Sequence, residues 1–174
     1  MTSLRNLSPK GCFGKSKSSL FIDPNDNTNK TAVLLNLIKN DSPYAEYIKK
    51  NKKILNLTHV LVNLLGLNIS HKQFVKSYKK QIDFDQTLIY MTELTFPYPT
   101  YKKFYEEYKT EINLNKVLIN LIAYKIPYNN FITEHKKALN FNRVFTDLVK
   151  LKIQHDEFRR DYGSEIFLEV EPCL

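Results

Sequence analysis

The sequence has few of the residues that mark turns, cross-links and membrane spans. Its 174 residues include four glycines and seven prolines, too few for the many turns of an all-β protein. The two cysteines, Cys12 and Cys173, lie near opposite ends of the chain and do not form a disulfide framework. No stretch approaches the roughly 18 uninterrupted apolar residues of a membrane span. These absences favour a helical protein of a reducing, intracellular compartment with no membrane span.

Lysine, by contrast, is abundant. The chain carries 26 Lys and Arg residues against 18 Asp and Glu residues, which gives a formal net charge of +8. The content of 43% hydrophobic and 25% charged residues predicts a folded domain rather than disorder. The positive excess favours a polyanionic partner such as nucleic acid, an anionic membrane surface or an acidic protein. The alternative is that the lysines only keep the protein in solution. The expected location is cytoplasmic, or nucleoid or nuclear.

The first 27 residues lack the pattern of the rest of the chain. They hold no acidic residue before Asp23, and Pro9, Gly11 and Gly14 interrupt any helix. We therefore predict that residues 1–27 form a basic, extended N-terminal arm; an organellar targeting segment is the alternative. The basic residues of this arm are Arg5, Lys10, Lys15 and Lys17.

Residues 28–165 repeat one pattern five times. The phrase INLNKVLINLI at residues 112–122 returns as LNLTHVLVNLL at 55–65, IDFDQTLIYMT at 82–92 and LNFNRVFTDLV at 139–149. The five units start at residues 28, 55, 82, 112 and 139, at spacings of 27, 27, 30 and 27 residues. A fixed period of this length is typical of arrays in which neighbouring units share one core. Residues 166–174 are predicted to form a C-terminal cap or tail.

Each unit has the pattern of a helix, a break and a second helix. Apolar residues at i, i+3 and i+4 spacing mark the buried stripe of the first helix. Breaks such as Ser42-Pro43 and Phe96-Pro97 then separate it from a second, shorter helix. Hydrogen-bond acceptors at the fourth position are predicted to be the N-caps of the first helices: Thr31, Thr58, Asp85, Asn115 and Asn142. Aromatic residues mark the core side of the second helices: Tyr47, Phe74, Phe104, Phe131 and Phe158.

The fold class that follows is all-α, a solenoid of about five helix–turn–helix repeats preceded by the basic arm. The third unit is three residues longer than the others. We place these residues in an inserted loop around Pro97-Tyr98-Pro99, where Tyr98 and Tyr101 would be exposed.

Much of the positive charge falls in the second helices or directly after them. In a solenoid the second helices line one surface, so these residues are predicted to form a basic, nucleic-acid-binding stripe. The alternative is that lysines near helix C-termini only complement the helix dipole. The predicted nucleic-acid-binding residues are Lys49, Lys50, Lys72, Lys76, Lys79, Lys80, Lys102, Lys103, Lys136, Lys137, Arg159 and Arg160.

Two stretches, LVNLLGLNISHKQFVKSYKK at residues 61–80 and LVKLKIQHDEFRRDYG at 148–163, resemble the helix-turn-helix of small DNA-binding proteins. The resemblance implies that the second helix enters the major groove of DNA. The residues that would then face bases or phosphates are His71, Lys72, Gln73 and Lys76, or His155, Asp156, Arg159 and Arg160. The short units leave no room for the third helix of that motif. A helical array that contacts mainly phosphates therefore fits the spacing better.

No motif points to catalysis, a cofactor or a metal. The stretch PKGCFGKS at residues 9–16 ends like a phosphate-binding loop, but Pro9 stands where that motif needs glycine. The four histidines are scattered and have no cysteine or acidic pair at ligand spacing. Glu106, Glu107 and Glu111 lie among lysines at salt-bridge spacing, which is typical of a solvated helix face. We therefore expect no enzyme activity, no catalytic residue, no cofactor, no metal site and no small-molecule substrate.

Two functions remain open after this reading of the sequence. The first is non-catalytic binding of DNA or RNA through the second helices, with little reading of bases. The second is a protein–protein interaction scaffold or a structural subunit of a larger assembly. In the second case the N-terminal arm and the aromatic stretch at residues 96–101 would contact the partner.

Overall fold

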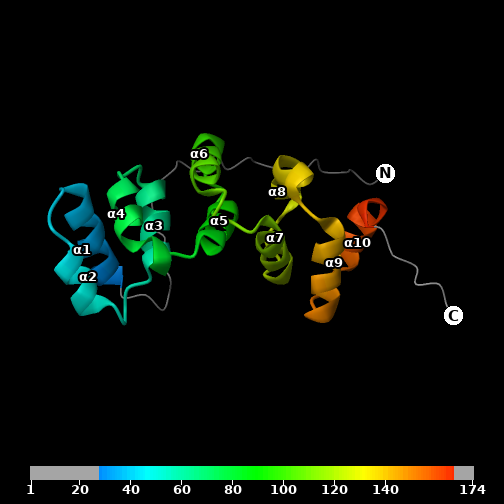
Figure 1. The fold of residues 1–174 in the computed structure, drawn as a ribbon, viewed down its shortest axis with the longest axis horizontal. Helices are drawn as coiled ribbons and strands as arrows, with labels where there is room; N and C mark the ends of the chain where they lie inside the picture. Colours follow the sequence, from blue (N-terminus) through cyan, green and yellow to red (C-terminus); the bar gives the residue numbers. More distant parts are fainter. Residues whose placement is uncertain (1–27, 167–174) are drawn as a thin grey trace, which may run out of the picture.

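A computed structural model describes residues 28–166, and within this range the protein is all-α, with ten α-helices, three short 3-10 helices and no strand (Figure 1). The first helices of the five units are α1 (Thr28–Lys39), α3 (Leu57–Gly66), α5 (Phe84–Glu93), α7 (Leu114–Ala123) and α9 (Phe141–Lys150). The second helices are α2 (Ala45–Asn51), α4 (Lys72–Tyr78), α6 (Tyr98–Tyr108), α8 (Asn129–His135) and α10 (Asp156–Tyr162). The 3-10 helices are η1 (Lys79–Gln81), η2 (Lys136–Ala138) and η3 (Gly163–Glu165). The predicted arm and residues 167–174 of the predicted tail lie outside the described residues.

The first helices pack against one another in chain order. Helix α1 contacts α3, α3 contacts α5, α5 contacts α7, and α7 contacts α9. Helices α2, α6 and α8 each contact the first helix of their own pair. Figure 1 shows the pairs following one another along the long axis of the molecule, with α6 and α8 on the same side of α5 and α7. None of the helices in the described range is long and apolar enough to cross a membrane.

The N-caps of α3, α5, α7 and α9 lie two residues before the predicted positions, and the predicted cap Thr31 lies inside α1. The side chain of Asn56 accepts hydrogen bonds from the amides of Thr58 and His59 at the start of α3. The equivalent residues Asp83, Asn113 and Asn140 cap α5, α7 and α9 in the same way, each accepting from the amide three residues on. The prediction that the fourth position supplies the caps is therefore wrong. The second position has the same chemistry and lies just outside the helix, where a cap belongs.

The side chains at the fourth position instead connect neighbouring pairs. Thr58 Oγ1 accepts a hydrogen bond from the backbone amide of Asp83, the capping residue of the next unit, at 3.0 Å. Asp85 accepts from the amide of Asn113 at 2.7 Å, and the third such bond, at 2.9 Å, joins Asn115 to the amide of Asn140. At the next position along the row, the Oδ1 atom of Asn142 is buried and has no hydrogen-bond partner among the described residues. One polar contact thus recurs at successive boundaries and stops at the last described pair.

Each first helix ends in a left-handed turn. The residues with φ between 49° and 58° recur at the unit spacing: Asp41, Asn68, Thr95, Lys125 and Lys152. The residue after each of them donates its amide to a carbonyl five residues earlier, for example Ile69 to Leu64 at 2.8 Å. This bond defines the Schellman motif, in which glycine usually takes the left-handed position. Because no glycine stands at any of the five positions, the turn has no marker in the sequence.

The three extra residues of the third unit lengthen a helix and do not form the predicted loop. Helix α6 begins at Tyr98 and has 11 residues, whereas the other second helices have seven. Pro97 stands at the N-cap and Pro99 within the first turn, where proline is tolerated because the first amides of a helix have no partner in it. Tyr98 is exposed as predicted, with 52% of its surface accessible. Tyr101 is not exposed: it is partly buried, and its hydroxyl pairs with His135 Nε2 at 2.8 Å.

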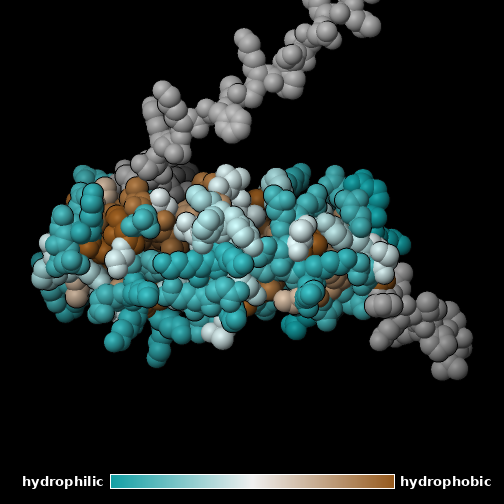
Figure 2. Space-filling view, turned by 90° about the horizontal axis from the view of Figure 1, so that it is seen from above, coloured by the Kyte–Doolittle hydropathy of each residue, from teal (hydrophilic) through white to brown (hydrophobic). Residues whose placement is uncertain are grey.

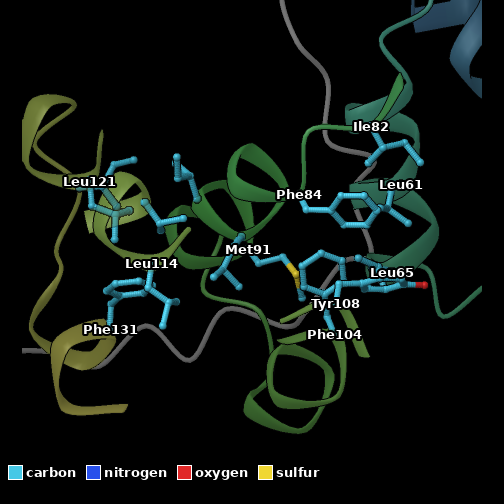
Figure 3. Packing of buried hydrophobic residues seen from close by; sticks show 14 of the residues in the cluster. Leu61, Leu65, Ile82, Phe84, Met91, Phe104, Tyr108, Leu114, Leu121 and Phe131 are labelled. Atoms are coloured by element: carbon cyan, nitrogen blue, oxygen red, sulfur yellow. The ribbon is translucent and has the colours of Figure 1, made fainter. Parts of the chain in front are cut away.

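One hydrophobic core continues through all the described pairs. Figure 3 shows its middle part, where Leu61 from α3, Phe84 and Met91 from α5, and Phe104 and Tyr108 from α6 lie in one cluster. The predicted aromatic positions of the second helices belong to this core. Phe74, Phe104, Phe131 and Phe158 are at most 2% exposed, and Tyr47 is partly buried. The core thereby fixes which side of each second helix faces solvent.

Candidate nucleic-acid interface

All twelve predicted binding residues are solvent-exposed. They lie on α2, α4, α6 and α10 and on the 3-10 helices η1 and η2, that is, on the second halves of the units. Each of the four α-helices turns its aromatic residue toward the core, which directs its lysines and arginines outward. Figure 2 views the molecule from the side of α6 and α8, and hydrophilic residues cover most of that face. The structure thus places the predicted residues where a large anion could reach them.

Three of the twelve residues are paired with carboxylates. Lys79 lies 2.8 Å from Glu111, and Lys136 lies 2.7 Å from Glu165; each pair joins a 3-10 helix to the following unit. The Nε atom of Arg160 lies 2.8 Å from its neighbour Asp161. The other nine residues have no ion pair within residues 28–166. Nine basic side chains are therefore available to a ligand without first leaving an acidic partner.

The second half of the middle unit carries more acidic side chains than those of its neighbours. Helix α6 holds Lys102 and Lys103, but Glu106 and Glu107 follow on the same helix, and Glu106 pairs with Lys109 at 3.1 Å. The hydrogen bond from Lys79 lowers the pKa of Glu111, which keeps this carboxyl ionised. A general acid needs a raised pKa, so Glu111 has the wrong environment for that role. These acids interrupt the basic surface.

The two histidines that the helix-turn-helix resemblance places against DNA are partly buried. The His71 ring lies 6.4 Å from the ring of Tyr108 in the next unit, and its Nε2 atom is buried without a hydrogen-bond partner in the described range. Burial lowers the pKa of His71, which favours the neutral ring. His155 packs edge-on against Phe145, with ring centroids 5.2 Å apart. Both side chains contribute to packing, and the exposed cations around them are the residues left to meet a ligand.

Reading the sequence missed one feature of the surface, a row of exposed apolar residues where the first helices end. Leu94, Tyr124 and Leu151 directly follow α5, α7 and α9, and they are 40%, 61% and 62% exposed. They occupy the same place in three successive units. Their shared place in the units could have indicated the row, but apolar residues at a helix end are ordinarily read as core.

The described residues contain no metal-binding group: no three His, Cys, Asp or Glu side chains lie close enough together to hold an ion. The comparisons with known proteins supply no family either. No protein-family model, no curated protein and no solved structure matches this chain. The functional argument therefore rests on the geometry and charge of the molecule itself.

Proposed function

We propose that the five helix pairs form an α-solenoid of repeats and that its second helices bind the phosphates of a nucleic acid without catalysis. The observation that carries this proposal is the exposure of all twelve basic residues on the second halves of the units, nine of them without an acidic partner in the described range. A row of repeats presents such residues at a regular spacing, as the backbone of a nucleic acid presents its phosphates.

The mechanism is neutralisation of phosphates with release of condensed counterions. Each lysine that pairs with a phosphate displaces a bound cation, so the affinity falls as salt concentration rises. Because phosphates carry no sequence information, we expect little preference among base sequences. Exposed Tyr98 adds an aromatic ring on which a base of a single strand could stack.

Titration of the purified protein against labelled double-stranded DNA, single-stranded DNA and RNA tests the proposal. We expect binding at about 50 mM salt that weakens at least tenfold at about 200 mM salt, as several phosphate contacts require. Binding that is the same at both salt concentrations would contradict the mechanism. No binding to any of the three at the lower concentration would overturn the function.

A protein–protein interaction scaffold is the second candidate, and the row of Leu94, Tyr124 and Leu151 favours it. These side chains expose apolar surface along one edge of three successive units, and such surface often marks a protein contact. Under this function a partner would cover the apolar row and the lysines would remain in solvent. Substitution of the exposed lysines would then leave the partner's affinity nearly unchanged.

A further inference from the structure

A pocket of about 440 Å³ opens between the third and fourth helix pairs. One wall comes from the end of α5 and the turn after it, with Glu93 and Phe96. Tyr98 and Tyr101 of the lengthened helix α6 form a second wall, and Glu134 of α8 belongs to the third. The extra residues that begin α6 thus help to build a concave site beside the turn that follows α5.

The lining of this pocket has a chemistry unlike that of the rest of the surface. Its walls combine four aromatic side chains, from Phe96, Tyr98, Tyr101 and Phe131, with the carboxylates of Glu93 and Glu134. No Lys, Arg or His of residues 28–166 lines it, although 26 of the 174 residues of the chain are Lys or Arg. Aromatic faces and carboxylates both attract cations, whereas both disfavour an anion.

Glu134 is held in place by a tyrosine of the opposite wall. The Tyr98 hydroxyl donates to both carboxylate oxygens of Glu134, at 2.8 and 3.0 Å, so the two walls are joined across one side of the pocket. The Tyr98 ring already attracts an ammonium group, since Lys102 Nζ lies 5.8 Å from its centroid. The carboxylate and the ring therefore form a preorganised edge of the site.

A second groove, between the fourth and fifth pairs, provides a comparison within the same molecule. It has a similar volume of about 430 Å³ and is lined by Asp156 and Glu157. However, Lys125 and His155 also line it, so its charge is mixed. Both sites have aromatic and acidic residues and similar volumes, but only the first is lined by acids without Lys or His among the described residues.

We propose that the pocket between α5, α6 and α8 binds the ammonium group of a lysine side chain presented by a partner protein. A lysine stem is long enough to carry its charge into a concave site, where the aromatic rings and the two carboxylates surround it. Leu94 lies next to Glu93 and is 40% exposed, so apolar surface borders the pocket for the flanking residues of the partner. This site adjoins the basic surface at Tyr98 and Lys102, but it would take a cation rather than a phosphate, so it goes beyond the proposed function.

The experiment measures binding of three capped amino acids to the full chain by shifts of backbone amide signals in NMR. The probes are Nα-acetyl-lysine methylamide, its form trimethylated on the side-chain nitrogen, and Nα-acetyl-norleucine methylamide. Norleucine keeps the unbranched stem and lacks the charge. We expect both cationic probes to shift the amides of residues 93–96, 98 and 134 and to bind at least fivefold more tightly than norleucine. Glu134→Gln should weaken the cationic probes about fivefold, because it removes one charge and leaves an oxygen for the Tyr98 hydroxyl.

Glu157→Gln in the second groove is the matched control and should leave all three affinities unchanged. Glu93→Gln supplies an independent variant if Glu134→Gln alters the fold. Equal binding of lysine and norleucine would overturn the proposal, because the pocket would then select apolar stems. The absence of cation binding at tens of millimolar, or shifts confined to other residues, would overturn it as well.

Discussion

The two ends of the row of helix pairs differ in the surface that they expose. In α1, α3, α5 and α7 one position that faces the following pair is buried and apolar: Leu35, Val62, Ile89 and Ile119, at most 8% exposed. The equivalent residue of α9 is Thr146, which is exposed. Arg143 and Asp147, one helical turn apart on α9, add an ion pair at 3.8 Å. The outer face of the last pair is therefore more polar than the equivalent inner faces, although Val149 of α9 is apolar and 48% exposed.

The first pair shows the opposite behaviour. The position that faces the preceding pair is 0% exposed in Val60, Thr87, Val117 and Val144, but Val33 of α1 is 40% exposed. Leu37, four residues on, is only partly buried, although its counterparts Leu64, Met91, Leu121 and Leu148 are fully buried. Hydrophobic residues also reach the surface in Figure 2 toward the end of the molecule that holds α1.

At the α9 end, the position that would face a further pair is polar. At the α1 end, the position that would face a preceding pair stays apolar although no described pair covers it. A terminal repeat with a polar outer face keeps such an array from associating through its end. Helix α9 meets this requirement at Thr146 but not at Val149, whereas α1 keeps the residues of an inner pair. The same substitution should therefore have different effects at an inner boundary and at an end.

The largest effect on the free energy of unfolding is expected at the position that faces the following pair, which is Ile89 in α5 and Thr146 in α9. Ile89→Thr removes apolar contacts at an inner boundary and buries a hydroxyl, so it should lower the free energy of unfolding by about 2.5 kcal/mol. The reverse change at the end, Thr146→Ile, should alter it by less than about 0.5 kcal/mol. Urea denaturation of both variants gives the comparison. Equal losses would mean that α9 does not end the packed array.

A smaller effect is expected from the polar contacts between pairs. Asp85→Ala leaves the amide of Asn113 without its acceptor and removes the 3.0 Å ion pair with Lys116, so we expect a loss of about 2 kcal/mol. Asn142→Ala at the last pair removes an oxygen that has no partner in the described range, and should cost less than about 0.5 kcal/mol. Thermal unfolding followed by circular dichroism measures both. A loss at Asn142 as large as that at Asp85 would show that the row of bonds continues.

The smallest loss in the free energy of unfolding is expected at the position that faces the preceding pair. Val117→Ala opens a cavity in a position that is 0% exposed, so the free energy of unfolding should fall by about 1.5 kcal/mol. Val33→Ala, the same change where 40% of the side chain is exposed, should cost less than about 0.5 kcal/mol. Denaturant midpoints at equal m-values test this pair. If Val33→Ala cost as much as Val117→Ala, the surface of α1 would be covered in solution.

The sequence predicted the helical class, the unit spacing and the aromatic residue that each second helix packs against the core, because these depend on local periodicity. It misplaced the N-caps because two positions in each unit carry suitable side chains. Asn113 and Asn115 look alike in the sequence, and only the position of the next pair shows that Asn115 bonds to Asn140. Such a role is non-local, and no spacing within one unit reveals it.

The sequence was enough to predict that the basic residues of the candidate site are exposed, but not their ion pairs or the burial of the residues beside them. Lysine positions on the second helices followed from the aromatic pattern, since residues off the buried face of an amphipathic helix are exposed. The ion pairs of Lys79 and Lys136 depend on contacts between units, and so does the burial of His71 against Tyr108. The pocket at Tyr98 was hidden because Pro97 and Pro99 suggested a loop, whereas they stand at the start of a helix.

The most direct test of the proposed function compares two triple variants that remove the same charge. The first variant changes three unpaired lysines in the second half of one unit to glutamine: Lys72, Lys76 and Lys80. The second variant makes the same change at three exposed lysines at or just after the ends of first helices: Lys39, Lys150 and Lys152. We predict that the first set weakens nucleic-acid binding at least tenfold and reduces the salt slope by about 2 to 3, while the second set changes affinity less than about twofold. Equal losses in both sets would show that net charge alone attracts the nucleic acid, and would contradict a binding surface on the second helices.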